Sequence, residues 1–301
     1  MVAPTTTANG YTGSTVQGTM QHQRVILRTL AVIALVALIE LAAAPLGHAQ
    51  TWLAPADPER GMLGPIDAIG AVVWNHGRSV DTEDFEAPTP LFLATLRSGG
   101  WDTFRFNRLR DGDTLARSSR ALVEDVHRLK QQGYRRIVLA GQSFGAFLSL
   151  LGADASDEVD AVIATAPAAY GNYADHYDTW RANATQLYPL LQRVIRARVM
   201  LFYFHGDEFD PGGRAERSRD ILAERHLDFL VIDQPRRLET HWAAGTPLFA
   251  QLYGDCILAF LDASPFAPGA ACDGGTYWAA APTPVRDAGA QADASLGVTA
   301  R

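Results

Sequence analysis

One serine lies in a pattern that is typical of nucleophilic catalysis. Residues 141–145 read GQSFG, which fits G-x-S-x-G with Ser143 at its centre. The pattern alone is common, but here it falls directly between a buried-type strand at 136–140 and a helical segment at 146–152. Such a turn forces the serine to the tip, at the carboxyl edge of the sheet. The two glycines leave room for the close backbone approach that the turn requires. We therefore predict that Ser143 is a nucleophile.

A serine hydroxyl needs a base at neutral pH, and that base needs an acid to orient it. His241 follows the last predicted strand, 228–232, and precedes the closing helix, 248–261. The other histidines lie in the N-terminal extension, on predicted helices or in loops that fit the role less well. His241 is therefore the predicted base.

Two aspartates compete for the role of the acid. The loop after the predicted strand 198–204 reads HGDEFDP. Asp207 follows the turn glycine, and Asp210 lies deeper in the loop, next to a proline. Spacing leaves both open, with a slight preference for Asp207 and with Glu208 as a weaker third candidate. The aspartate that is not the acid is expected to cap the helix 214–226 or to pair with Arg214.

Strands and helices alternate around these residues, which predicts a three-layer α/β/α fold with a mostly parallel, doubly wound sheet. The predicted strands are 68–74, 101–107, 136–140, 159–166, 198–204 and 228–232. The predicted helices are 91–99, 114–132, 146–152, 184–195, 214–226 and 248–261.

The elbow at Ser143 and the chain order nucleophile, acid, histidine resemble the α/β-hydrolase superfamily, over roughly residues 61–261. The resemblance implies this fold and a serine-esterase-like triad. It also implies an oxyanion hole, built from the N–H of Phe144 and a second N–H in the sequence HGRS at 76–79. Arg78 is the expected second donor and Gly77 the alternative. Many members carry the acid three positions after the turn glycine, where this chain has Phe209, so the identity of the acid stays open.

An aromatic insert at about 168–197 is expected to cover the site as a short lid. Its rings and the one beside the base are candidates for the substrate pocket, or they simply pack the insert onto the sheet. These candidates are Tyr170, Tyr173, Trp180 and Trp242. Because the insert is short, we do not expect a large lipase-type lid.

The expected activity is the hydrolysis of small carboxylic esters through an acyl-enzyme. An amidase or peptidase with the same triad and a non-catalytic binding protein on a hydrolase scaffold are the alternatives. We expect no cofactor and no metal, since zinc-type clusters and a phosphate-binding P-loop motif are missing from the sequence. A formal net charge of -7 argues against a nucleic-acid partner. The oligomeric state stays open.

The N-terminal segment 1–49 has the parts of a secretory signal peptide: basic residues, an apolar run at 30–44 and small residues before a cut after Ala49. A retained membrane anchor is the alternative, but we expect cleavage, a secreted or periplasmic location and no stable membrane insertion afterwards. In that oxidising compartment Cys256 and Cys272 are expected to form a disulfide. The catalytic domain is then 50–264, followed by an Ala/Pro/Gly-rich tail at 265–301 that is partly disordered.

Overall fold

A computed structural model describes the backbone of residues 52–78, 88–108, 113–169, 177–210, 212–262, 272 and 275–278. The side chains of 177–184 and 275–278 are outside this description. The chain divides into residues 1–51 and 52–301, and all described residues belong to the second unit. The predicted signal peptide therefore lies outside the described residues, as does most of the predicted tail.

Eight strands form one sheet in the order β1-β3-β2-β4-β5-β6-β7-β8. The inner six pair in parallel, and the edge strands β1 and β8 pair antiparallel with β3 and β7. The strands are β1 (Leu53–Pro55), β2 (Ala71–Asn75), β3 (Asp102–Phe106), β4 (Ile137–Gln142), β5 (Ala161–Thr165), β6 (Arg198–Tyr203), β7 (Phe229–Asp233) and β8 (Gly275–Trp278).

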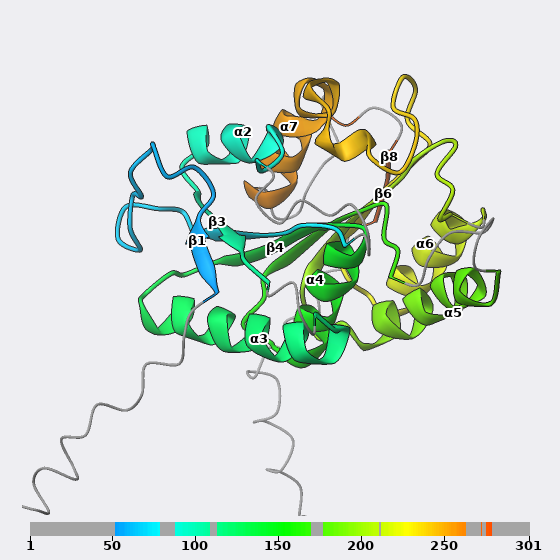
Figure 1. Cartoon of the computed structure of the whole chain (residues 1–301), viewed down its shortest axis with the longest axis horizontal. Coiled ribbons are helices and arrows are strands. Elements are labelled where there is room, and N and C mark those ends of the chain that lie inside the picture. Colours follow the sequence, from blue (N-terminus) through cyan, green and yellow to red (C-terminus); the bar gives the residue numbers. More distant parts are fainter. Residues whose placement is uncertain are drawn as a thin grey trace, which may run out of the picture. The chain divides into compact units, whose positions relative to one another are not determined.

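Helices cover both faces of this sheet (Figure 1). One layer contains α3 (Leu115–Gln131), α4 (Phe144–Ala155), α5 (Tyr177–Arg193) and α6 (Arg214–Glu224), and the other contains α2 (Phe92–Ser98) and α7 (Pro247–Asp262). A short 3₁₀ turn, η1 (Ala243–Gly245), precedes α7. The strands are apolar on both faces because helices cover both sides of the sheet. In β4, Leu139 packs in the core under α3 and α4, whereas Val138 packs in the core under α2 and α7. The predicted three-layer fold is confirmed.

The structure differs from the sequence patterns mainly at the edges. The strand expected at 68–74 is shifted to 71–75, and α5 begins at 177 instead of 184. The patterns also predicted neither β1 nor β8 as a strand. Both are only three or four residues long and pair on one side, so neither carries the long apolar run that marks an inner strand.

A disulfide joins Cys256 in α7 to Cys272, across a separation of 16 residues. Both cysteines are buried in the core beneath α2 and α7. The bond therefore attaches Cys272 to α7, and it links the same pair that the sequence singled out.

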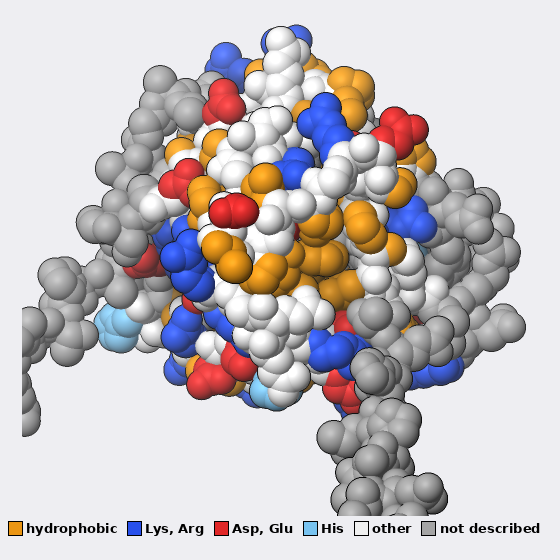
Figure 2. All heavy atoms as spheres, turned by 90° about the vertical axis from the view of Figure 1, so that its left-hand side faces the viewer, with side chains coloured by type: hydrophobic (Ala, Val, Ile, Leu, Met, Phe, Trp, Pro, Cys, Tyr) orange, Lys and Arg blue, Asp and Glu red, His pale blue; other side chains and the backbone are white. Residues whose placement is uncertain are grey.

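The surface at the β1 edge carries charges of both signs around a patch of hydrophobic side chains (Figure 2). Basic side chains do not gather into a stripe on this face, in keeping with the net negative charge of the chain. Within the described ranges, no helix is both long and apolar enough to cross a membrane. The apolar run at 30–44 lies outside those ranges.

Candidate active site

The strand order places the site at the carboxyl edge of the sheet. After β2 the chain adds β3 on one side, then returns to add β4 on the other side of β2. At such a switch point the loops after the two strands diverge and leave a crevice that ligands use. Ser143 follows β4, and the predicted oxyanion loop at 76–78 follows β2. The two segments are therefore neighbours at this crevice.

Ser143 forms the strained turn between β4 and α4. Its φ of 56° and ψ of −120° lie in a region that non-glycine residues rarely adopt. Backbone hydrogen bonds hold it there: its N–H donates to Thr165 O (3.0 Å), and its carbonyl accepts from the N–H groups of Ala146 (3.0 Å), Phe147 (3.3 Å) and Ala168 (3.3 Å). The residue is only 6% exposed. Strain that is held by the surrounding backbone in this way is typical of a functional position.

Gly145 lets the start of α4 lie against the end of β2. A Cβ at this position would lie 1.9 Å from Asn75 O and 2.5 Å from His76 O. Asn75 is itself fully buried, and its Nδ2 donates to Ser149 Oγ in α4 (3.1 Å). Glycine is therefore required for the close approach of the nucleophile turn to the predicted oxyanion loop.

Gly145→Ala is expected to destabilise the fold by about 3 kcal/mol, at the upper end of overpacking costs, because the clash is with backbone atoms that cannot rotate away. Urea unfolding measures this loss. Gly61→Ala is the matched control, since a Cβ there has no described atom within 4 Å, and we expect a change within about 0.5 kcal/mol. Equal stabilities of the two variants would contradict the packing described for Gly145.

His241 and Asp207 form a buried pair. The Nδ1 atom of His241 lies 2.9 Å from Asp207 Oδ1, and the two side chains are 2% and 1% exposed. Two backbone contacts align their loops: a parallel bridge between His205 and Glu239, and a hydrogen bond from Thr240 N–H to His205 O (2.8 Å). Asp207 Oδ1 also accepts the N–H of Phe209 (2.8 Å). Asp207 is thus held in place by its own loop.

Asp210 has a different partner. Its Oδ1 accepts from Arg214 Nε (3.0 Å) and from Gly212 N–H (2.9 Å). Arg214 is fully buried and also donates to Pro167 O (2.7 Å). Of the two aspartates that the spacing left open, the structure brings Asp207 to the histidine and places Asp210 in an ion pair with Arg214. Glu208 is exposed.

Phe209 occupies the position that the resemblance would assign to the acid, and it packs on His241 instead. Its ring centroid lies 4.2 Å from that of His241. An apolar ring at this place shields the His241–Asp207 hydrogen bond from water, which strengthens the electrostatic attraction between the two groups.

The serine and the histidine are linked through the residue before the serine. Gln142 Nε2 donates to the carbonyl oxygen of His241 (3.1 Å). The hydroxyl of Ser143 points to Ala168 O at 3.4 Å, a long contact. His241 Nε2 is buried and has no hydrogen-bond partner in the described part of the chain. Among the described residues, nothing therefore prevents this nitrogen from accepting a hydrogen bond from a hydroxyl group.

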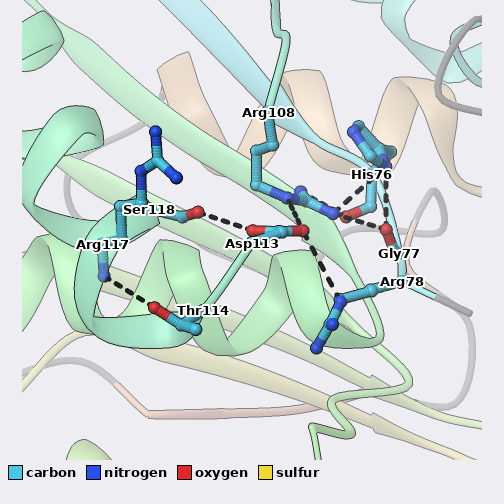
Figure 3. Close-up of polar contacts among 8 residues, drawn as sticks. All are labelled: His76, Gly77, Arg78, Arg108, Asp113, Thr114, Arg117 and Ser118. Atoms are coloured by element: carbon cyan, nitrogen blue, oxygen red, sulfur yellow. Dashed lines mark hydrogen bonds and ion pairs between the residues drawn. The ribbon is translucent and has the colours of Figure 1, made fainter. Parts of the chain in front are cut away.

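The predicted oxyanion donors lie on two segments. Phe144 is the first residue of α4, where backbone N–H groups have no acceptor within the helix. Gly77 and Arg78 lie in the loop after β2, whose carbonyls accept hydrogen bonds from the buried Arg108 (Figure 3). Sequence reasoning missed Arg108, because a single arginine after a strand gives no local signal of burial.

Of the predicted pocket residues, only Trp242 can be placed. Its ring meets that of His241 edge-on at 5.2 Å between centroids, and the residue is 54% exposed. Tyr170 and Tyr173 lie outside the described residues, and Trp180 lies in α5 with a side chain that is also outside them.

The fold is similar to that of solved hydrolases. An acetyl ester-xyloside bifunctional hydrolase from Caldicellulosiruptor lactoaceticus aligns with a TM-score of 0.50 at 16% identity, over 74% of this chain and 100% of that one. An esterase from Pyrococcus furiosus aligns with a TM-score of 0.50 at 14% identity, over 66% and 82%. For the Pyrococcus horikoshii acylaminoacyl peptidase the TM-score is 0.49 at 16% identity, over 66% of this chain and only 38% of that chain.

No family model matches the sequence, and no curated protein is significantly similar to it. At identities of 14–16% the likeness concerns the fold. It agrees with the mostly parallel sheet and with the helices on both of its faces. This chain has the α/β-hydrolase fold.

Proposed function

We propose that this protein is a serine hydrolase that cleaves carboxylic esters, with Ser143 as nucleophile, His241 as general base and Asp207 as the orienting acid. The buried 2.9 Å hydrogen bond between His241 and Asp207, beside the strained turn at Ser143, is the observation that carries the proposal. A carboxylate that accepts from Nδ1 keeps the proton on that nitrogen and leaves Nε2 as the basic one.

The proposed reaction begins when the Ser143 hydroxyl turns from Ala168 O to His241 Nε2. The imidazole takes the proton as Ser143 Oγ attacks the carbonyl carbon, and the oxyanion is stabilised by the N–H groups of Phe144 and of Arg78 or Gly77. The imidazolium then protonates the leaving alcohol. Finally, His241 deprotonates a water molecule, which attacks the acyl-enzyme and releases the carboxylic acid product from Ser143.

We expect esters, not amides, as the substrates. Amide cleavage demands stronger protonation of the leaving group, and peptidases often bind the amino terminus of the substrate through acidic side chains. Next to Asp207 and His241 in the sequence, the described acidic residues are Glu208 and, two positions before the histidine, Glu239; both are exposed. Solved structures with this fold include esterases and peptidases, so the fold alone does not decide between them.

A comparison of p-nitrophenyl acetate with the p-nitroanilide of the same acid tests the substrate class. We expect a clearly larger kcat/KM for the ester, because its leaving group needs less assistance from His241. Equal or faster turnover of the anilide would favour an amidase. No turnover of either compound by folded protein would favour a non-catalytic binding protein.

We also propose that the protein is exported and that residues 1–49 are removed. The unit that contains the site begins at Trp52, and the Cys256–Cys272 disulfide suits an oxidising compartment. The intact mass of protein from the native extracellular or periplasmic fraction tests this. A mass that still includes residues 1–49 would overturn the proposal of cleavage.

A further inference from the structure

A buried arginine lies behind the predicted oxyanion loop. Arg108 follows β3, and its side chain is fully buried. Its guanidinium group donates from Nη1 to His76 O (2.8 Å) and from Nη2 to Gly77 O (2.5 Å), and Nη2 lies 3.2 Å from His76 Nδ1 (Figure 3). Two successive carbonyl groups of one loop are therefore held on the same side by a single rigid group.

The geometry of the peptide bond converts these two contacts into an orientation of N–H groups. In a trans peptide, the carbonyl of one residue and the N–H of the next point in opposite directions. The carbonyl of His76 shares its peptide plane with the N–H of Gly77, and the carbonyl of Gly77 shares its plane with the N–H of Arg78. Arg108 thus fixes both candidate donors of the loop so that they point away from the guanidinium group.

The same guanidinium group contacts the other half of the predicted oxyanion hole. Its Cζ atom lies 5.1 Å from the centroid of the Phe144 ring, within the range of a cation–π interaction. Phe144 is 4% exposed, so this contact is desolvated. Arg108 therefore touches the residue that supplies one oxyanion donor and the backbone that supplies the other.

Arg108 is itself anchored by an acidic side chain. Asp113 Oδ2 accepts from Arg108 Nε (2.9 Å), and Asp113 Oδ1 accepts from Ser118 Oγ in α3 (2.6 Å) (Figure 3). The Nε of Arg78 lies 3.9 Å from the same carboxylate. A buried pair contributes little net stability compared with an apolar replacement, so stability alone does not explain its presence. One known use of such a pair is to fix a local geometry.

We propose that Arg108, anchored by Asp113, is a positioning residue that sets the spacing and direction of the oxyanion donors. This inference rests on the proposed function, because it assigns Arg108 a role in stabilising the oxyanion formed at Ser143. Lysine cannot replace it, since a single ammonium group lacks the planar fork that reaches Asp113 and both carbonyls together.

Arg108→Lys is expected to lower kcat for p-nitrophenyl acetate by about 10- to 100-fold, because a misplacement of the donors by about 1 Å has effects of that order. Acylation and deacylation both pass through an oxyanion, so KM is expected to stay within about twofold of the wild-type value. The affinity for an aryl trifluoromethyl ketone, which forms an oxyanion adduct, is expected to fall by the same factor as kcat/KM.

Arg198→Lys is the matched control. Arg198 also pairs with an aspartate (Asp228, 3.6 Å) and lies over an aromatic ring (Phe260, 4.5 Å). It is, however, the first residue of β6 and lies at the amino ends of the parallel strands, whereas the site lies at their carboxyl ends. Wild-type kcat in Arg198→Lys and a reduced kcat in folded Arg108→Lys support the proposal. If Arg108→Lys does not fold, kcat and the affinity for the trifluoromethyl ketone are measured on Asp113→Asn instead.

Three results would overturn the inference. The first is a folded Arg108→Lys, or its substitute Asp113→Asn, with wild-type kcat. The second is a reduced kcat with unchanged affinity for the trifluoromethyl ketone. The third is a wild-type protein that does not hydrolyse the ester, which would remove the proposed function and the role of Arg108 with it. The first two results leave the proposed function intact, whereas the third removes it. Failure of this inference and failure of the proposed function are therefore distinguishable.

Discussion

Asp207→Asn is expected to lower kcat/KM by about 10⁴-fold, the effect of losing the orienting carboxylate in a serine–histidine–acid triad. The carboxylate of Asp207 accepts the Nδ1 proton of His241 at 2.9 Å in a buried setting. An asparagine can turn its NH₂ group to the ring, which favours the tautomer with its proton on Nε2. That tautomer cannot take the proton of Ser143. Steady-state hydrolysis of p-nitrophenyl acetate measures the loss.

Asp210→Asn is the matched control, three residues away in the same loop. Because Asp210 bonds to Arg214 and not to the base, its loss weakens a buried contact by about 2 kcal/mol and leaves kcat/KM within about tenfold of the wild type. Thermal unfolding and kinetics on both variants separate stability from catalysis. A 10⁴-fold loss of kcat/KM in Asp210→Asn, together with an active Asp207→Asn, would show that Asp210 and not Asp207 is the acid.

Ser143→Ala is expected to lower kcat by about 10⁶-fold, because removal of the nucleophile leaves only the binding site and the oxyanion donors. We expect the fold to be unaffected: among the described residues the hydroxyl makes a long contact with Ala168 O (3.4 Å), and the turn is held by backbone hydrogen bonds that Ser143→Ala retains. We therefore expect wild-type stability with almost no turnover. Ester hydrolysis and urea unfolding of the same preparation measure the two properties.

The strained turn at Ser143 could be predicted from the sequence because its signals are local. A buried strand, two glycines and a helix stand in direct succession around Ser143. Apolar runs also predicted the inner strands, since helices cover both faces of the sheet. The order of the loops then led to His241, because the carboxyl ends of parallel strands meet at one edge.

The choice between Asp207 and Asp210 could not be made from spacing. It depends on how the loop turns after β6, where a hydrogen bond from Phe209 N–H orients Asp207 and Arg214 captures Asp210. Both contacts are local, but the contact that distinguishes the two aspartates, between Asp207 and His241, joins residues that are 34 positions apart and leaves no periodic trace in the sequence. Arg108 was missed for a similar reason, since its carbonyl and acid partners lie on two other segments of the chain.

The nucleophile itself is tested most directly by a fluorophosphonate probe, which reacts with serines that a neighbouring base activates. Intact-mass analysis of the wild-type protein is expected to show one adduct, and peptide mapping is expected to place it on Ser143. Folded Ser143→Ala is expected to show none. An adduct on another serine, or none on folded wild-type protein, would contradict the account of Ser143, His241 and Asp207 as a working triad.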